Sequence, residues 1–203
     1  MRYAFIVATA LLMPLSVLAE GAPPSAQLCV ACHGETGPSP FPGVPTIHGL
    51  PEVVIENALY DFRGHTRPCR KSACSAQGTC PDMDMCAVAE HMTHDDMEVL
   101  GSWFDSRPWV HAREDFDAAL AVRGKAIHEE QCEICHSGGG MDPLDEASML
   151  RGQRADYLRK AFADYREGRR MAVAAMDARF KQITDDQAAA LIAFYSSPVE
   201  ADD

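Results

Sequence analysis

Two five-residue stretches of the sequence have the residue types and the spacing that bind a porphyrin covalently. They are Cys29-Val30-Ala31-Cys32-His33 and Cys132-Glu133-Ile134-Cys135-His136. On a helical turn, two thiols three residues apart point to the same side and can reach the two vinyl groups of one porphyrin. The histidine that follows then lies beneath the iron as its proximal ligand. One copy could be a zinc or redox dithiol with a chance histidine, but two copies favour two covalently attached haem c groups.

The N-terminus has the features of a secretory signal peptide over residues 1–19. Arg2 supplies the positive charge, residues 4–18 are largely apolar, and Ala19 is the small residue expected at a cleavage site. No later apolar run is long enough to span a membrane. We therefore expect a periplasmic protein, in which cysteines that bind no haem can oxidise.

The chain contains an internal duplication that keeps its register from each haem histidine. Counted from His33 and His136, the matched pairs are Gly49 with Gly152, sixteen residues on, and Asp61 with Asp164, twenty-eight residues on. Each copy then ends in an amphipathic helix opened by a threonine. Thr184 with Gln187 fits a capping box, whereas Thr93 is expected to be a plain N-cap.

A helical approach to the second motif runs from about Phe116 to Cys132. On this segment Gly124 could let another helix cross closely, or it could simply be tolerated at a cost of about 1 kcal/mol relative to alanine. The sequence does not decide between these two roles.

The two copies also share a methionine, which we predict to be the sixth iron ligand of each haem. Met85 and Met176 both stand eight residues before the threonine that opens the last helix of their copy. Methionine sulfur favours ferrous iron and raises the reduction potential, as electron transfer requires. The neighbouring Met83 and Met171 have no counterpart in the other copy, so we rank them below Met85 and Met176.

Four cysteines remain, and they fall in one short part of the first copy. They are Cys69, Cys74, Cys80 and Cys86, within the stretch CRKSACSAQGTCPDMDMC. The interval from Asp61 to Met85 is twelve residues longer than the interval from Asp164 to Met176. The first copy therefore carries a Cys-rich insertion at about residues 67–84, in the loop that presents Met85.

Two disulfides are the default state of these four cysteines in an oxidising compartment, and three pairings are possible. A bridge from Cys69 to Cys86 would contribute about 3 kcal/mol by the chain-entropy estimate. The alternative is a soft-metal site for Cu(I) or zinc, with Met83, His91 or His94 nearby. A catalytic dithiol is less favoured, because the insertion contains no C-x-x-C pair. The other histidines lack convincing repeat partners, and we expect them on the surface: His48, His65, His91, His94, His111 and His128.

With these motifs the sequence resembles the dihaem cytochrome c4 class, and within it the cytochrome subunit of flavocytochrome c sulfide dehydrogenase. The segments FDAALAVRGKAIHEEQCEICHSGGG and MLRGQRADYLRKAFADYREGRRM carry most of this resemblance. It implies an all-α fold of two tandem class I cytochrome c domains, each built around one covalent haem. We place the first domain at residues 20–107 and the second at residues 108–203. The Cys-rich insertion departs from the family pattern.

The resemblance implies an electron-transfer subunit that is not catalytic alone. Its expected donor is an FAD-containing sulfide dehydrogenase flavoprotein subunit, and its expected acceptor is a soluble protein such as a cytochrome c. A free dihaem carrier that donates to a terminal oxidase is the alternative, and a peroxidase with one open haem is a third reading. The formal net charge of −12 argues against a nucleic-acid partner, because the chain has no basic stripe to replace phosphate counterions.

Overall fold

The computed structural model of the chain describes residues 22–71, 74, 78–80 and 82–198. All regular secondary structure in these residues is helical, as the sequence predicts. The helices are α1 (Ala26–His33), α2 (Glu52–Arg63), α4 (Met85–Ala89), α5 (His94–Asp105), α6 (Ala118–Gln131), α7 (Ser137–Gly140), the short 3₁₀ helix η1 (Pro143–Asp145), α8 (Ala155–Arg166), α9 (Ala174–Phe180) and α10 (Asp185–Ser196). Within the described residues, no helix is long and apolar enough to cross a membrane. The predicted signal peptide at residues 1–19 lies outside them.

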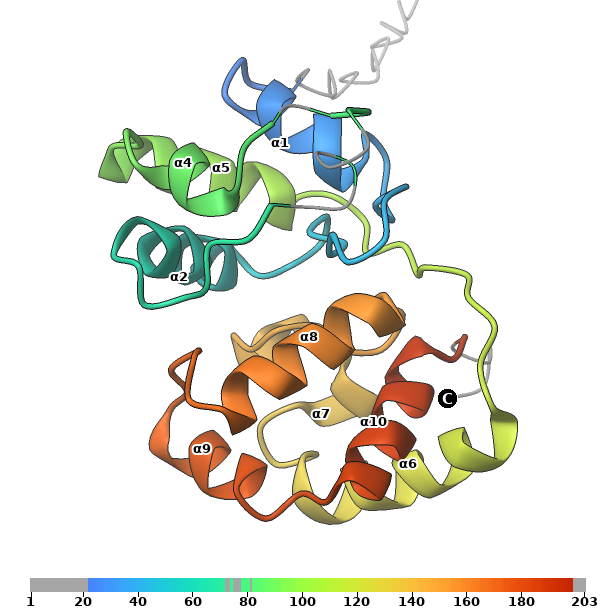
Figure 1. Ribbon diagram of the computed structural model, residues 1–203. Coiled ribbons are helices and arrows are strands. Elements are labelled where there is room, and N and C mark those ends of the chain that lie inside the picture. The colour runs from blue at the N-terminus through green and yellow to red at the C-terminus, as the bar shows by residue number, and fades with distance from the viewer. Residues whose placement is uncertain (1–21, 72–73, 75–77, 81, 199–203) are drawn as a thin grey trace, which may run out of the picture.

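The helices form two groups, one above the other in Figure 1. Helices α1, α2, α4 and α5 make the first group, and α6 to α10 make the second. An irregular segment, residues 108–117, runs along one side of the molecule and joins them (Figure 1).

The helix bounds preserve the internal duplication. Both bounds of α8 follow those of α2 by 103 residues, and both bounds of α10 follow those of α5 by 91 residues. The difference between the two offsets is the twelve-residue insertion, which lies between α2 and α4. Each copy therefore repeats the same two long helices around its own core.

Capping explains why the last helix of each copy begins where it does. The Thr184 side chain accepts from the Gln187 backbone N–H, and the Gln187 side chain accepts in return from the backbone N–H of Thr184. Thr93 makes the same reciprocal pair with Asp96, so the prediction of a plain N-cap there was wrong. The shorter aspartate carboxylate still reaches back to the N-cap backbone, as a glutamate does in the usual form of this motif.

Each helical group has an apolar cluster, and Met149 from the second half of the chain joins the cluster of the first group. In the second group Leu158, Phe180 and Leu191 belong to one buried cluster. There α6 and α10 cross at Gly124, where an added methyl group would collide with the carbonyl oxygen of Ala190. The close helix crossing that the sequence allowed at Gly124 is confirmed. The backbone of α10 lies where a side chain at this position would be.

The matched glycines tie the loop after each haem motif to the end of the last helix. The backbone N–H of Gly49 donates to the Phe104 carbonyl at 2.8 Å, and that of Gly152 donates to the Tyr195 carbonyl at 2.6 Å. Both glycines have positive φ, +75° and +84°, which a side chain would strain. The linker residue Trp109 packs directly on Gly49, where a Cβ would come within 2.6 Å of its backbone nitrogen.

The two groups meet along a polar seam. The backbone N–H of Thr46 donates to the Gln153 side chain at 2.8 Å, and that side chain donates to the Thr46 carbonyl at 2.9 Å. Arg70, from the insertion, forms a bidentate pair with the Asp164 carboxylate on α8, with both N–O distances 2.6 Å. These contacts fix the orientation of the first group on the second.

Candidate haem sites

His33 is the last residue of α1, and its side chain is only 7% exposed. Its Nδ1 atom lies 2.8 Å from the carbonyl oxygen of Pro45. A carbonyl can only accept, so Nδ1 carries the proton and Nε2 keeps its lone pair for a metal. Burial lowers the pKa of His33 to about 4, so the imidazole stays neutral and able to ligate.

His136 of the second group is partly buried and follows a turn after α6, as the N-cap of α7. Burial lowers its pKa, and the backbone of Ser148 opposes that shift. Ser148 stands twelve residues after His136, the offset of Pro45 from His33. The buried Nδ1 atom of His136 nevertheless makes no hydrogen bond of ordinary geometry. Equivalent loops therefore approach the two histidines, but of the two rings only that of His33 makes a hydrogen bond of ordinary geometry to its loop.

The four cysteines of the two motifs are unpaired thiols, namely Cys29, Cys32, Cys132 and Cys135. Burial raises the pKa of Cys29 to about 11, and it raises those of Cys32 and Cys132. Cys135 is exposed. Each group therefore has two unpaired thiols next to a histidine whose pKa burial lowers, with His33 buried and His136 partly buried.

Met85 and Met176 each pack against the core of their own group. Met85 opens α4, and the side chain of its N-cap Asp84 accepts from the two backbone N–H groups that follow Met85. Met176 lies in α9 against the second core. The competitor Met171 is 72% exposed and lies away from that core. The role of Met85 and Met176 as sixth ligands stays a prediction.

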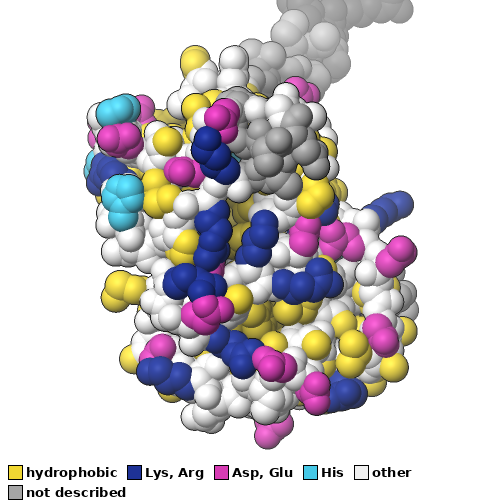
Figure 2. Space-filling model, in the orientation of Figure 1, with side chains coloured by type: hydrophobic (Ala, Val, Ile, Leu, Met, Phe, Trp, Pro, Cys, Tyr) yellow, Lys and Arg dark blue, Asp and Glu magenta, His cyan; other side chains and the backbone are white. Residues whose placement is uncertain are grey.

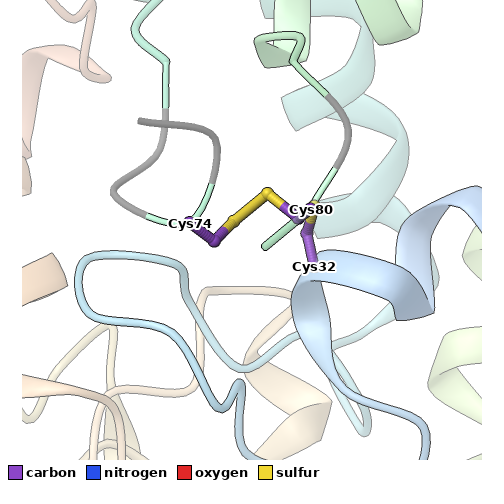
Figure 3. Close-up of side chains that lie close together, drawn as sticks. All are labelled: Cys32, Cys74 and Cys80. Atoms are coloured by element: carbon purple, nitrogen blue, oxygen red, sulfur yellow. A yellow bond between two sulfur atoms is a disulfide. The ribbon is translucent and has the colours of Figure 1, made fainter. Parts of the chain in front are cut away.

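The insertion contains two disulfides, Cys69–Cys86 and Cys74–Cys80. The sequence left three pairings and a soft-metal site open, and a disulfide sulfur offers no thiolate to a metal. Cys86 follows Met85 directly, so the first bridge anchors the start of α4 to the end of the loop that leaves α2. The second bridge lies against Cys32 of the first haem motif (Figure 3).

Basic side chains gather along the seam between the two groups (Figure 2). The Arg67 guanidinium donates to the Tyr157 hydroxyl at 2.9 Å, and Arg170 donates to it at 3.5 Å. Burial raises the pKa of Tyr157, but the two positive charges outweigh this effect and lower it to about 8. Arg67 also lies near enough to His33 to lower that pKa. The seam therefore brings positive charge close to the first haem site, and nothing in the sequence pattern signalled it.

Two histidines expected on the surface are buried, so that prediction was wrong for them. His48 is 1% exposed and lies 3.0 Å from the Gly34 carbonyl oxygen. His128 is fully buried, between the Tyr195 hydroxyl at 2.9 Å and the Glu133 carboxylate at 2.6 Å. Both polar rings are accommodated because each finds hydrogen-bond partners in the core. The sequence signal for His128 is its spacing of four residues from Gly124, which puts both on one face of the helix.

A cavity of about 390 Å³ opens among α6, α8 and α10. It contains none of the cysteines, histidines and methionines expected to hold haem. Apolar side chains such as Phe162 and Ile192 line it, together with Arg159 and Arg166. This cavity therefore lies apart from the haem motifs and does not mark the expected redox chemistry.

The residues present fit two covalently bound haem groups. Each motif offers the thiol pair and the neutral imidazole, and each group adds a core methionine. Several buried polar atoms also lack hydrogen-bond partners, among them Trp103 Nε1 and Thr46 Oγ1 in the first group and Arg170 Nε in the second. Because buried donors are normally satisfied, a bound group with carboxylates is the kind of molecule that would complete these sites.

Comparison with known proteins gives a consistent result. Residues 119–194 match the family model described as cytochrome c oxidase, cbb3-type, subunit III. Cytochrome c4 of Azotobacter vinelandii is 29% identical over 71% of this chain and 70% of its own length. A thiosulfate dehydrogenase electron acceptor of Stutzerimonas stutzeri is 31% identical over 74% of this chain and 68% of its own length. The structure of Acidithiobacillus ferrooxidans cytochrome c4 superimposes with a TM-score of 0.68 at 26% identity, covering 85% of this chain and 99% of that one.

These likenesses confirm the predicted fold of two tandem cytochrome c domains and the two covalent haem c groups. They do not single out the flavocytochrome subunit among the dihaem cytochromes. The chain belongs to the dihaem cytochrome c4-like family of electron-transfer proteins, which includes the thiosulfate dehydrogenase electron acceptors.

Proposed function

We propose that this protein accepts single electrons in the periplasm from a catalytic subunit that oxidises a reduced inorganic sulfur compound, and passes them to a soluble acceptor. The sequence favours an FAD-containing sulfide dehydrogenase as the donor. The relative at 31% identity, named as the electron acceptor of a thiosulfate dehydrogenase, supports a sulfur-oxidising donor more broadly. The observation that carries the proposal is the pair of matched haem sites held across one fixed seam.

When bound, each haem supplies a one-electron couple between ferric and ferrous iron. The chain supplies the ligands and their surroundings. The Pro45 carbonyl fixes the His33 ring with its Nε2 atom available, and burial keeps the ring neutral. Met85 and Met176 would provide the second axial ligand, which leaves no open position for substrate chemistry. Two sites in one chain suit a donor that releases two electrons.

The two sites differ in how far their thiol edge is exposed. The Cys74–Cys80 disulfide lies against Cys32, whereas Cys135 is exposed beside Ile134, which is itself 89% exposed. Leu144, 87% exposed, belongs to the η1 turn that follows the second motif. We assign the docking of the soluble acceptor to this open apolar edge of the second site.

The charge around this edge indicates the kind of acceptor that would dock there. Residues 126–150 contain six acidic side chains and no lysine or arginine: Glu129, Glu130, Glu133, Asp142, Asp145 and Glu146. A small redox protein with a basic rim around its own exposed cofactor edge complements such a surface.

The test is reduction of the purified, oxidised dihaem protein by each donor. A sulfide dehydrogenase flavoprotein with sulfide, and a thiosulfate dehydrogenase with thiosulfate, are mixed with it in separate experiments, and the ferrous haem band is followed. Fast reduction in one mixture names the donor. If neither donor reduces the dihaem protein, although both reduce another acceptor, the proposal is contradicted.

The docking assignment has its own test with a matched control. Ile134→Asp should slow electron transfer to a basic acceptor such as a small cytochrome c by about tenfold or more, because it removes an apolar contact at the centre of an interface. Val122→Asp introduces the same charge at a site 73% exposed on α6 and should leave the rate within about twofold. Equal rates for the two variants would place the docking surface elsewhere.

A free dihaem carrier that donates to a terminal oxidase is the second candidate, and the cytochrome c4 relatives favour it. It predicts a protein that purifies without flavin or a catalytic subunit and is oxidised by membranes that contain the oxidase. Co-elution of a flavin or of a dehydrogenase with the haems would favour the first candidate.

A further inference from the structure

The Cys-rich insertion brings a disulfide to the attachment point of the first haem. The Sγ atoms of Cys32, Cys74 and Cys80 all lie within 4.8 Å of one another (Figure 3). Cys32 comes from α1, and the two others come from the loop between α2 and α4. A disulfide that only closes a loop requires no other sulfur beside it, so the position of Cys32 next to the Cys74–Cys80 bridge needs another explanation.

The local backbone holds this arrangement in place. The backbone N–H and the hydroxyl of Thr79 both donate to the Cys74 carbonyl, at 2.9 and 3.1 Å. Cys74 is fully buried and Cys80 is partly buried. Of the two bridged sulfurs, that of Cys80 is therefore the more accessible to solvent.

We propose that Cys74 and Cys80 form a second redox centre that exchanges electrons with the first haem through the sulfur of Cys32. When the haem is attached, the Cys32 sulfur is bonded to the porphyrin. An electron leaving the pair then crosses one short sulfur-to-sulfur gap before it enters the macrocycle. The proposal rests on attachment of the haem at this site, and it adds a thiol-oxidising step to the proposed electron relay.

The step balances between the pair and the two haems. Cys74 and Cys80 in the dithiol state lose two electrons and two protons and form their S–S bond. The protons go to solvent, and the two electrons reduce two ferric irons to ferrous iron, one in each domain. The reaction runs in this direction because protein dithiols are stronger reductants than a haem with a methionine ligand.

A low-molecular-weight thiol returns the pair to the dithiol state. Its thiolate attacks the accessible Cys80 sulfur, which releases Cys74 as the leaving thiolate and forms a mixed disulfide. A second thiol molecule then attacks the mixed disulfide, which releases the oxidised donor and leaves Cys80 as a thiol. Two thiols are consumed for each two ferric irons reduced.

The second disulfide of the insertion provides a matched control. Cys69–Cys86 lies in the same insertion, but its neighbour is His65, with Nδ1 3.3 Å from the Cys69 sulfur. No haem cysteine belongs to that group of described side chains. If contact with Cys32 matters, only the Cys74–Cys80 pair should exchange electrons quickly with haem.

The experiment uses the intact dihaem protein without oxygen. Its disulfides are first reduced with dithiothreitol, the reagent is removed, and two equivalents of ferricyanide then oxidise the haems. The ferrous band is followed with time, and the thiols are counted by alkylation and peptide mass. We expect the ferrous band to return, with loss of the Cys74 and Cys80 thiols and two ferrous irons regained for each bridge formed.

The variants decide between the proposal and its alternatives. Cys74→Ser/Cys80→Ser should lose this return or slow it at least tenfold, whereas Cys69→Ser/Cys86→Ser should retain the full yield of ferrous iron together with the loss of the Cys74 and Cys80 thiols. Equal return in all three proteins, or haems that stay ferric while the Cys74 and Cys80 thiols persist, would overturn the proposal. Haem content is measured first, so a chain lacking the first haem would count against the assigned haem site and not against the sulfur pathway.

Discussion

At the scale of single residues, each haem site depends on side chains that the duplication keeps in register. His33 is held by the Pro45 carbonyl, and His136 faces Ser148 at the same offset. The surroundings of the two sites differ, because His128 near the second site bridges the Tyr195 hydroxyl and the Glu133 carboxylate, whereas His48 and Arg67 lie near the first. Two sites with one ligand set can therefore differ in potential through their neighbours.

The predicted methionine ligands can be tested one at a time. Met176→Ala should remove the sulfur-to-iron charge-transfer band of one oxidised haem and lower the reduction potential of that haem, because methionine sulfur stabilises ferrous iron. Met171→Ala, at a side chain 72% exposed, should change neither property. Visible spectra and a potentiometric titration measure both, and a retained band in Met176→Ala would assign the ligand to another side chain. An oxidised wild-type protein that shows the band for both haems would also exclude a peroxidase with an open iron.

At the scale of helices, the crossing of α6 and α10 is the tightest packing feature of the second domain. Gly124 faces the Ala190 carbonyl and the Phe194 side chain, and no side chain fits between them. Helix propensity alone favours alanine at this position. The steric cost of a methyl group here should exceed this gain in helix propensity, because the atom it would collide with belongs to the backbone of α10.

Gly124→Ala should lower the free energy of unfolding by roughly 1–3 kcal/mol, as overpacked core substitutions do. Val122→Ala lies on the exposed face of the same helix and should change it by less than about 0.5 kcal/mol. Chemical denaturation followed by far-ultraviolet circular dichroism measures both. A stabilised Gly124→Ala protein would show that α10 moves away at little cost.

The two bridges of the insertion should differ in what they stabilise. Cys69–Cys86 closes a separation of 17 residues and Cys74–Cys80 one of 6. By the chain-entropy estimate, replacing the first pair with serine should cost about 3 kcal/mol and replacing the second about 2 kcal/mol. Only the first replacement should also weaken the methionine-to-iron band of the first haem, because Cys86 follows Met85. Urea titrations and visible spectra of the two double variants test this order.

At the scale of the whole molecule, a charged seam joins the two domains. Arg70 pairs with Asp164 across it, and the Tyr157 hydroxyl receives hydrogen bonds from an arginine of each domain, Arg67 and Arg170. The positive charges lower the pKa of Tyr157 from its ordinary value of 10 to about 8. A phenol with a lowered pKa favours the folded state in its ionised form.

The sign of the pH effect follows from this shift. Between pH 8 and 10 the unfolded chain binds more protons at Tyr157 than the folded one, so this group adds stability as pH rises and loses it as pH falls through about 8. As pH rises across this range, the free energy of unfolding of the wild type should therefore increase relative to that of Tyr157→Phe. Tyr165→Phe should not remove the gain, because burial raises the pKa of Tyr165. Parallel pH dependences for the wild type and Tyr157→Phe would contradict the assignment.

Much of the architecture could be predicted because local patterns determine it. The thiol and histidine spacing predicted the haem sites, and the offsets from His33 and His136 predicted the duplication with its insertion. Thr93 and Thr184 predicted where the last helices begin. For Gly124 the sequence left open whether another helix crosses there, since it does not show which helix approaches this position.

The sequence by itself determined which residues could hold haem, how many haems there are and where the extra residues lie, because covalent attachment and helix caps depend on neighbours within one turn. Only the tertiary structure decided that Cys69 pairs with Cys86, that Cys74 and Cys80 lie against Cys32, and that His48 and His128 are buried. It also decided that Arg67 and Arg170 meet at the Tyr157 hydroxyl in the seam between the domains. Which of these residues meet depends on how the helices and loops of each domain pack, and for the seam on how one domain packs on the other, and not on local spacing.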